Sequence, residues 1–524
     1  MKDQKSFFGT RGRRLKMLML VAVVVPSFLL FGYNNGVTGG IMGLESFVSQ
    51  FPQIDTVNTE GALKAQASRV KGVVTGSYDL GAVFGSLSSI AYGDRVGRLR
   101  TVVIGLVLAI IALAIEASSY SLAQLVVGRV LIGGSIGIIS AAIPVWQSEC
   151  STQSHRGTFV IFEGMCIASG IALSEWIDLA FSFLPKSSGQ WRAPIIFPVI
   201  FPIIVLPIIL SMPESPRWLM SRGRIDEARS TLSALLDVPA NSDEVETELS
   251  KVQDSLERMG SNRSLLNLLK NGKDRLLHRT LLAMCGQMFQ QMCGISALVF
   301  YTSTFFSEMG FEELNSRIIG CCLVTFQALC SVIPLFTVDR YGRRKLLMFS
   351  AVGLSISMAV IAGTGSGGNK VIAAVVFCFV YDFFFPIGFL GLTFLYAAEL
   401  SPLAYRVPIT AIANATQWMC QFLVAQVTPP GTTSLKNRYY IIYAVLNAAF
   451  AVIVYFLFPE TNGRSLEDMD MVFESSTSIF STVSVSRDLF NKKTITDKSG
   501  THQIVELEKS QTIVHEEDVD HNIV

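Results

Sequence analysis

The stretch Asp94-Arg95-Val96-Gly97-Arg98 returns 245 residues later as Asp339-Arg340-Tyr341-Gly342-Arg343. Two other motifs repeat at offsets of 250 and 246 residues: Glu149 with Arg156 returns as Glu399 with Arg406, and Pro213-Glu214-Ser215 returns as Pro459-Glu460-Thr461. Three motifs at nearly one offset indicate that the chain consists of two halves of common origin. Glycine allows a tight turn between helices, and arginine bridges carboxylates through forked hydrogen bonds. We therefore predict that the repeated charged residues form salt bridges that close one end of the protein: Asp94, Arg98, Glu149, Arg156 and Glu214 in one half, and Asp339, Arg343, Glu399, Arg406 and Glu460 in the other.

The composition is that of a membrane protein. Half of the 524 residues are hydrophobic, 16% are charged and the mean hydropathy is +0.46, so lipid must cover the apolar surface that a soluble fold could not bury. The net charge of +1 argues against nucleic-acid binding. The nine cysteines and five histidines show neither disulfide nor metal-ligand spacing. We expect no metal, no cofactor and no enzymatic activity, because no nucleophile with its base and no phosphate loop is visible.

Twelve mostly apolar runs are long enough to span a membrane, and they predict an all-α integral membrane protein with six helices in each half. The runs lie at 17–38, 71–93, 101–118, 121–147, 157–181, 193–211, 279–305, 316–337, 345–364, 371–398, 407–428 and 438–458.

The basic loops share one side of this topology, and the positive-inside rule assigns that side and both termini to the cytoplasm. The predicted segments are a cytoplasmic N-terminus at 1–16, a first half at 17–213, a helical linker at 214–278, a second half at 279–470 and a disordered tail at 471–524. Within the linker, residues 224–236 and 243–256 alternate charge with leucine at helical spacing, which predicts two amphipathic helices.

Together these motifs resemble the sugar porters of the major facilitator superfamily, and the fungal hexose-type members most of all. The resemblance runs from about residue 31 to 470 and includes Phe31-Gly32-Tyr33-Asn34-Asn35, the two Pro-Glu motifs, and the pair Gln290-Gln291 before Gly294-Ile295. It implies a plasma-membrane carrier for a small sugar that works by alternating access. A sugar sensor on the same fold is the alternative, although the sensors of the family typically have longer tails.

The resemblance also implies a sugar site, because amides and an aromatic ring suit a neutral polyol in a membrane. The implied substrate-binding residues are Gln287, Gln290, Gln291, Ser296, Phe394, Gln417, Trp418 and Asn34. Ser296 and Phe394 replace the asparagine and tryptophan usual in the family, so pentose, galactose, a disaccharide or an acidic polyol remain open beside hexose. For an isolated amide, an inter-helix hydrogen bond is the alternative interpretation.

Energy coupling is predicted from position 34. In proton-coupled relatives an aspartate there pairs with an arginine that this chain keeps as Arg129. Asn34 cannot exchange a proton near neutral pH, so we predict uniport. The alternative is proton symport through Asp382 or Glu163, which lie inside predicted spans where an unpaired charge is costly. A neutral carboxylic acid bonded to a neighbouring helix is an equally good interpretation of Asp382.

Overall fold

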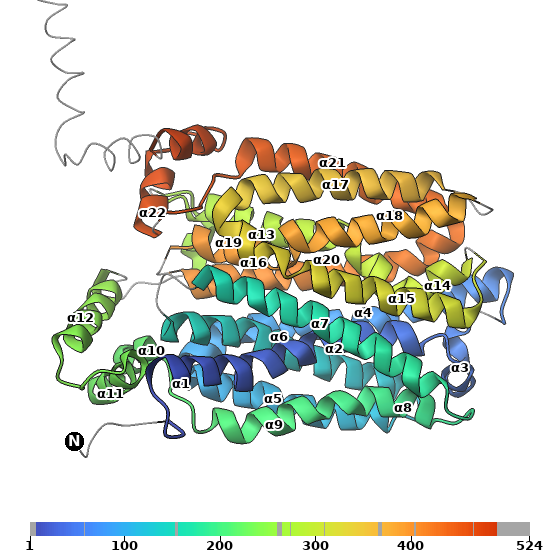
Figure 1. Ribbon diagram of the computed structural model, residues 1–524, viewed down its shortest axis with the longest axis horizontal. Coiled ribbons are helices and arrows are strands. Elements are labelled where there is room, and N and C mark those ends of the chain that lie inside the picture. Colours follow the sequence, from blue (N-terminus) through green and yellow to red (C-terminus); the bar gives the residue numbers. More distant parts are fainter. Residues whose placement is uncertain are drawn as a thin grey trace, which may run out of the picture.

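The computed structural model describes residues 7–56, 58–151, 156–258, 265–272, 274–308, 310–364, 369–402, 405–464 and 466–489. The long helices run nearly parallel to one long axis (Figure 1). The first half contains α1–η1–α2 (Gly12–Met19, Leu20–Val24 and Val25–Ile41), the short α3 (Glu45–Gln50) and η2 (Pro52–Ile54), α4 (Gly61–Val96), α5 (Arg98–Ala117), α6 (Leu122–Cys150), α7 (Arg156–Ser182) and α8–η4–α9 (Gly189–Ile196, Phe197–Val199 and Ile200–Ile209).

The second half repeats this arrangement after a linker. It contains α13 (Leu276–Met292), α14 (Ile295–Glu308), α15 (Glu313–Cys330), α16 (Ile333–Tyr341), α17 (Arg343–Gly363), α18–η6–α19 (Asn369–Phe385, Pro386–Leu390 and Leu392–Leu400), α20 (Arg406–Leu435), η7 (Lys436–Tyr439) and α21 (Tyr440–Leu457). α13 and α14 together make one traversal, as do α15 and α16, so each half crosses the bundle six times.

The helices are compatible with the twelve predicted spans. Within the described part of the chain, eight helical stretches are long and apolar enough to cross a membrane, and the bent pair α15–α16 gives a ninth. One of the eight, Arg406–Leu457, holds both α20 and α21. The other two traversals are α4, which is rich in small polar residues, and α13–α14, which is broken at Gly294 with φ +103°. The predicted fold class is confirmed.

Glycines allow very close packing within the first half. In α4, a Cβ on Gly81 or Gly85 would collide with the α6 backbone at Val130 and Gly134, and a Cβ on Gly133 of α6 would collide with the α4 backbone. α2 and α7 meet in the same way, since a Cβ on Gly32 would collide with the backbone of Ile167. These helix pairs therefore touch backbone to backbone, which is the closest approach that two helices make. The two halves meet along α4 and α20, α7 and α15, and α2 and α14.

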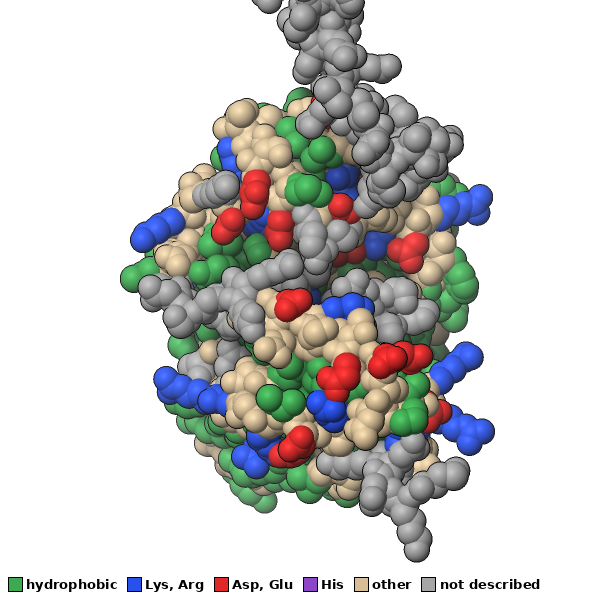
Figure 2. Space-filling model, turned by 90° about the vertical axis from the view of Figure 1, so that its left-hand side faces the viewer, with side chains coloured by type: hydrophobic (Ala, Val, Ile, Leu, Met, Phe, Trp, Pro, Cys, Tyr) green, Lys and Arg blue, Asp and Glu red, His purple; other side chains and the backbone are tan. Residues whose placement is uncertain are grey.

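Three short helices join the halves at one end of the bundle, which we call the linker end; the opposite end is the distal end. α10 (Pro216–Ser221), α11 (Ile225–Leu236) and α12 (Asp243–Arg258) pack around their own small core, which includes Trp218 and Leu232. α11 and α12 confirm the two predicted amphipathic helices. Arg11 fastens the N-terminal segment to α11 through the carbonyls of Ser233 and Val238. Figure 2 looks onto this end and shows Lys and Arg side chains around its rim.

The C-terminal segment also lies at the linker end (Figure 1). α22 (Leu466–Ser475) crosses the predicted boundary at 470, and helical structure continues from 481 to 489. α22 docks on the start of α13, where the Arg279 guanidinium pairs with Asp470 and lies 4.4 Å from the Phe473 ring centroid. Ordered helix therefore extends past the predicted start of the tail, and residues 490–524 lie outside the described part.

Candidate substrate site and gating networks

Three of the predicted sugar-binding residues lie on α13, just before the break in the seventh traversal. Gln287, Gln290 and Gln291 are all buried. The Gln290 amide donates 2.9 Å to the carbonyl of Leu390 in η6. The Oε1 atom of Gln291 accepts a 2.7 Å bond from Ser296, the residue that replaces the usual asparagine. In this arrangement Ser296 positions Gln291 across the break in the helix.

Two more predicted site residues lie on α20, which packs against α13. Gln417 is buried and Trp418 is 0% exposed. The Trp418 ring lies between two aromatic rings of the first half, with centroids 5.0 Å from Phe31 and 5.7 Å from Tyr78. Trp418 therefore packs between the two halves.

Four buried polar atoms of these residues have no hydrogen-bond partner among the described residues: Oε1 of Gln287, Oε1 of Gln290, Oε1 of Gln417 and Nε1 of Trp418. Buried polar groups are nearly always hydrogen-bonded, so these four atoms are expected to bind a partner. Three acceptors and one donor on two adjoining helices are the complement that sugar hydroxyls, which both donate and accept, would satisfy.

The structure connects the other two predicted site residues, Asn34 and Phe394, less directly with the glutamines of α13. The Asn34 amide donates 2.9 Å to the carbonyl of Leu30 on its own helix. Phe394 is half-buried on α19. Three described hydrogen bonds connect α20 to the first half. Gln421 donates to Asn35 at 3.2 Å, and the Asn414 amide donates to the hydroxyls of Ser86 and Ser140.

The gating residues of the first half form a compact network at the linker end. Arg98 pairs with Glu149 at 3.1 Å and also donates to the carbonyl of Gly93. Glu214 accepts from the backbone N–H groups of Leu99 and Ser215. It thereby satisfies a free N–H in the first turn of α5, where a helix favours negative charge. Burial raises the pKa of Glu214 against the opposing effect of these N–H donors.

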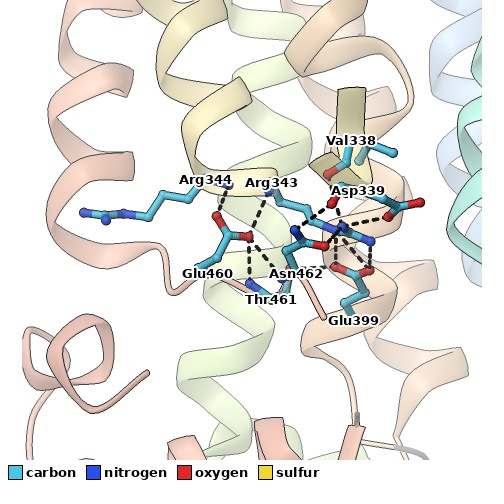
Figure 3. A network of polar contacts seen from close by, with 8 residues as sticks. All are labelled: Val338, Asp339, Arg343, Arg344, Glu399, Glu460, Thr461 and Asn462. Atoms are coloured by element: carbon cyan, nitrogen blue, oxygen red, sulfur yellow. Dashed lines mark hydrogen bonds and ion pairs between the residues drawn. The ribbon is translucent and has the colours of Figure 1, made fainter. Parts of the chain in front are cut away.

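The second half contains the same network with additional members (Figure 3). Arg343 pairs with Glu399 at 2.8 Å and donates to the carbonyl of Val338. Glu460 accepts from the backbone N–H groups of Arg343 and Arg344 at the start of α17. Both Pro-Glu glutamates thus receive helix N–H groups, a role that the salt-bridge prediction did not include. Three more polar residues complete the network: Asp339, Thr461 and Asn462.

Some predicted members of the networks are less fully defined. The side chains of Asp94 and Arg156 lie outside the described part of the structure. Arg406 begins α20 and is half-buried. The described ion pairs of Arg98 with Glu149, and of Arg343 with Glu399 and Asp339, each join residues of one half.

Buried carboxyl groups are more numerous than the sequence analysis anticipated. Asp382 and Glu163 are 2% and 5% exposed, and neither makes an ion pair among the described residues. Glu116 on α5 was not predicted, yet its carboxylate lies 3.6 Å from Arg129. Glu175 and Asp178 on α7 are also buried. An acidic residue inside an apolar run is the signal that would have found all three.

Comparison with known proteins agrees with this architecture. The family model described as "Sugar (and other) transporter" matches residues 18–473. The sugar transporter STL1 of Saccharomyces cerevisiae is 33% identical over 90% of this chain and 83% of its own length. The MFS-type transporter oryC of Aspergillus oryzae is 34% identical over 91% of this chain and 88% of its own length.

Solved structures show the same fold. The proton:xylose symporter XylE, bound to 6-bromo-6-deoxy-D-glucose, superposes with a TM-score of 0.75 at 21% identity, covering 88% of this chain and 98% of that one. The chain is therefore a multi-pass membrane transporter, not an enzyme, and it belongs to the sugar porter family of the major facilitator superfamily.

Proposed function

We propose that this protein carries a neutral sugar, a hexose or a related monosaccharide, across the plasma membrane by alternating access. The observation that carries the proposal is the set of unpartnered polar atoms on Gln287, Gln290, Gln417 and Trp418. These atoms are buried at the contact between α13 and α20, and a bound polyol would pair them. The names of the similar transporters support the same substrate class.

The orientation follows from charge. The linker end carries the basic N-terminal segment and the Arg-rich loops between α4 and α5 and between α16 and α17. We infer that this end and both termini face the cytoplasm, because short basic loops are retained there. The distal end then faces the outside of the cell.

Uptake of labelled D-glucose, D-xylose and D-galactose tests the substrate class. Gln290→Ala and Gln291→Ala are expected to weaken transport strongly while the protein still reaches the membrane, because each change removes hydroxyl partners from a buried ligand. Gln190→Ala is the matched control, since its amide bonds to the carbonyls of Ser182 and Leu184 near the distal end. An unchanged apparent affinity in both Gln290 and Gln291 variants would exclude them from the site.

Two modes of transport are candidates, uniport and proton-coupled symport. Asn34, which cannot exchange a proton, supports uniport. A second mode, proton symport, is favoured by a specific contact: Arg129 lies 3.6 Å from Glu116, whereas Asn34 bonds to Leu30. An ionisable partner of Arg129 is therefore present on another helix. Sugar accumulation under an inward proton gradient, abolished by a protonophore, identifies symport; equilibration that a protonophore does not affect identifies uniport.

A further inference from the structure

The seventh traversal is broken between α13 and α14, and side chains of two other helices bond to the chain at this break. Cys293 and Gly294 separate the two helices, and Gly294 has φ +103°. The carbonyl of Cys293 accepts a 3.2 Å bond from the Tyr381 hydroxyl of α18 and a 3.0 Å bond from the Asn447 amide of α21. Two helices of the second half therefore hold the break at one oxygen atom.

The carbonyl of Cys293 needs these donors because of where it lies. The last carbonyl groups of a helix have no N–H partner within that helix. Cys293, Tyr381 and Asn447 are each 0% exposed, and a buried carbonyl group is nearly always hydrogen-bonded. A carbonyl oxygen has two lone pairs, so one hydroxyl and one amide together satisfy it.

The break is bonded to the candidate sugar site on both sides. The thiol of Cys293 donates 2.9 Å to the carbonyl of Gln290, and the Tyr381 hydroxyl also donates to this sulfur at 3.3 Å. Beyond the break, Ser296 donates 2.7 Å to Gln291. A shift of the chain at Cys293 would therefore move the glutamine pair relative to Ser296.

Gly294 packs against the helix that carries Asn447. A Cβ on Gly294 would lie 2.8 Å from the ring of Tyr443 in α21 and 3.0 Å from the Cε atom of Met358 in α17. The carbonyl of Tyr443 accepts a 2.8 Å bond from the Asn447 amide. Asn447 thus uses one amide nitrogen to bond both to the break and to the residue that packs against it.

A chain of hydroxyl groups continues from α21 to α20, the helix of Gln417 and Trp418. The hydroxyl of Tyr443 bonds to that of Tyr439 at 2.6 Å, and Tyr439 bonds to Thr428 of α20 at 3.0 Å. The helix that holds the break is therefore also bonded to the second helix of the candidate sugar site.

We propose that Tyr381 and Asn447, which we call the break clamp, are positioning residues of the sugar site. The proposal rests on the proposed carrier function. The clamp holds the broken traversal in the arrangement in which Gln290 and Gln291 bind sugar, and it does so through the Cys293 carbonyl without contacting the sugar.

Loss of the clamp has a defined consequence for transport. The break can then adopt other arrangements, and the apparent dissociation constant for sugar rises as the fraction of protein in the binding arrangement falls. A saturating concentration of sugar selects the binding arrangement again, so the maximum rate of exchange should change little.

The first test measures exchange of labelled D-glucose and D-xylose by the full chain in proteoliposomes. Tyr381→Phe and Asn447→Leu each remove a hydrogen bond to the Cys293 carbonyl, and each should raise the sugar concentration for half-maximal exchange by up to about fivefold. Tyr381→Phe keeps the aromatic ring and therefore decides the test if Asn447→Leu fails to fold.

Ser355→Ala is the matched control. It removes a 2.8 Å bond from α17 to the carbonyl of Ala444 in α21, one turn before Asn447, and leaves the break unchanged. Its half-maximal concentration should equal that of the unaltered protein.

The second test measures the break itself, through the reaction of the Cys293 thiol with N-ethylmaleimide. The modified peptide is identified by its mass, so the other cysteines do not interfere. Because Cys293 is 0% exposed, its reaction should be slow in the unaltered protein and in Ser355→Ala. In Tyr381→Phe the rate should rise about fivefold, and whichever of the two sugars is exchanged should lower it again at saturation.

The proposal is overturned if the half-maximal concentration stays unchanged in both clamp variants, or if it rises equally in Ser355→Ala. A lower maximum rate at unchanged affinity, or an unchanged reactivity of Cys293 in Tyr381→Phe, would also overturn it. Absence of exchange of every sugar by the unaltered protein would instead contradict the proposed function, whereas the reactivity of Cys293 would still show whether the clamp holds the break.

Discussion

The two halves carry one network in two versions, which differ in the two residues that follow each Pro-Glu pair. In both halves a glycine with positive φ, Gly97 or Gly342, precedes a helix whose first N–H groups are bound by the Pro-Glu glutamate. In both, an aromatic donor bonds to the proline carbonyl of that motif: Trp146 to Pro213 and Tyr396 to Pro459. The shared part is therefore a helix cap supplied by a distant loop.

The two networks differ in the residues that come directly after the Pro-Glu pair in the sequence. In the first half, Ser215 accepts from the N–H of Trp218 and Pro216 begins α10, so the chain turns into the linker. In the second half, Thr461 donates to Glu399, and Asn462 accepts 2.6 Å from Arg343. The same motif thus starts a helix in one half and adds two bonds to the salt bridge in the other. We conclude that residues after the motif decide how firmly each half is fastened at the linker end.

The largest expected effect comes from the arginines. Arg343→Gln should cost ~3 kcal/mol of stability, because it leaves the Glu399 carboxylate without its cation in a largely buried site. Arg98→Gln should cost less, since the counterparts of Thr461 and Asn462 in the first half are Ser215, which caps α10, and Pro216, which begins it. Thermal unfolding of the two purified variants in detergent measures the difference, and equal losses would contradict the comparison.

The glycines should behave alike. Gly97 and Gly342 have φ of +104° and +89° with extended ψ, and a Cβ would lie 2.8 Å from Glu214 or 2.6 Å from Glu460. Alanine at either position should cost about 2 kcal/mol of strain. Because the cap is the shared part, Gly97→Ala and Gly342→Ala should lower the unfolding temperature by similar amounts, with Gly363→Ala, which has open space around it, as the control.

The extra bonds of the second half are tested by Asn462→Ala. Loss of a hydrogen bond to a charged group should cost about 1.5 kcal/mol. The corresponding change in the first half, Pro216→Ala, removes no hydrogen bond and should have a smaller effect. A greater loss in Pro216→Ala would show that the helix start, and not the polar contact, determines stability at this end.

Replacing Glu149 or Glu399 by Gln should have the smallest effect of these changes. We expect it to change the rate of transport and not the affinity for sugar. Each change weakens one salt bridge and shifts the balance between conformations by ~1 kcal/mol, which corresponds to about fivefold in rate. Sugar exchange and equilibrium binding should be measured side by side. If binding and exchange fall in parallel with no change in access from the linker end, these residues do not act as gates.

Much of the fold was predictable because apolar runs and repeated motifs report directly on membrane spans. The residues at which the helices begin and end were less predictable. α4 begins at Gly61, ten residues before residue 71, where the second span was predicted to start. The first turns of this helix are polar, and hydropathy identifies only the apolar part of a helix. The Pro-Glu glutamates were predicted as salt-bridge partners, but their helix-capping contacts depend on where a distant loop lies, which no local pattern specifies.

For the candidate sites too, the sequence predicted residues but not their contacts. The glutamines on α13 were named through a resemblance, and the structure adds that Ser296 bonds to Gln291. The resemblance implied that Arg129 is the arginine that pairs with position 34 in proton-coupled relatives, whereas in this structure Arg129 pairs with Glu116. No local sequence pattern reports this contact, because it depends on how closely α5 and α6 pack at Gly128, where a Cβ would lie 2.9 Å from the Cα atom of Glu116.

The backbone contacts of α4 with α6 determine how this carrier can change shape. Where Gly81, Gly85 and Gly133 bring the backbones of the two helices into contact, sliding one helix past the other would press backbone atoms together. The first half should therefore behave as a stiff body. Two spin labels placed on α4 and α6 should keep a fixed separation throughout the cycle, while labels on α4 and α20 should report two separations.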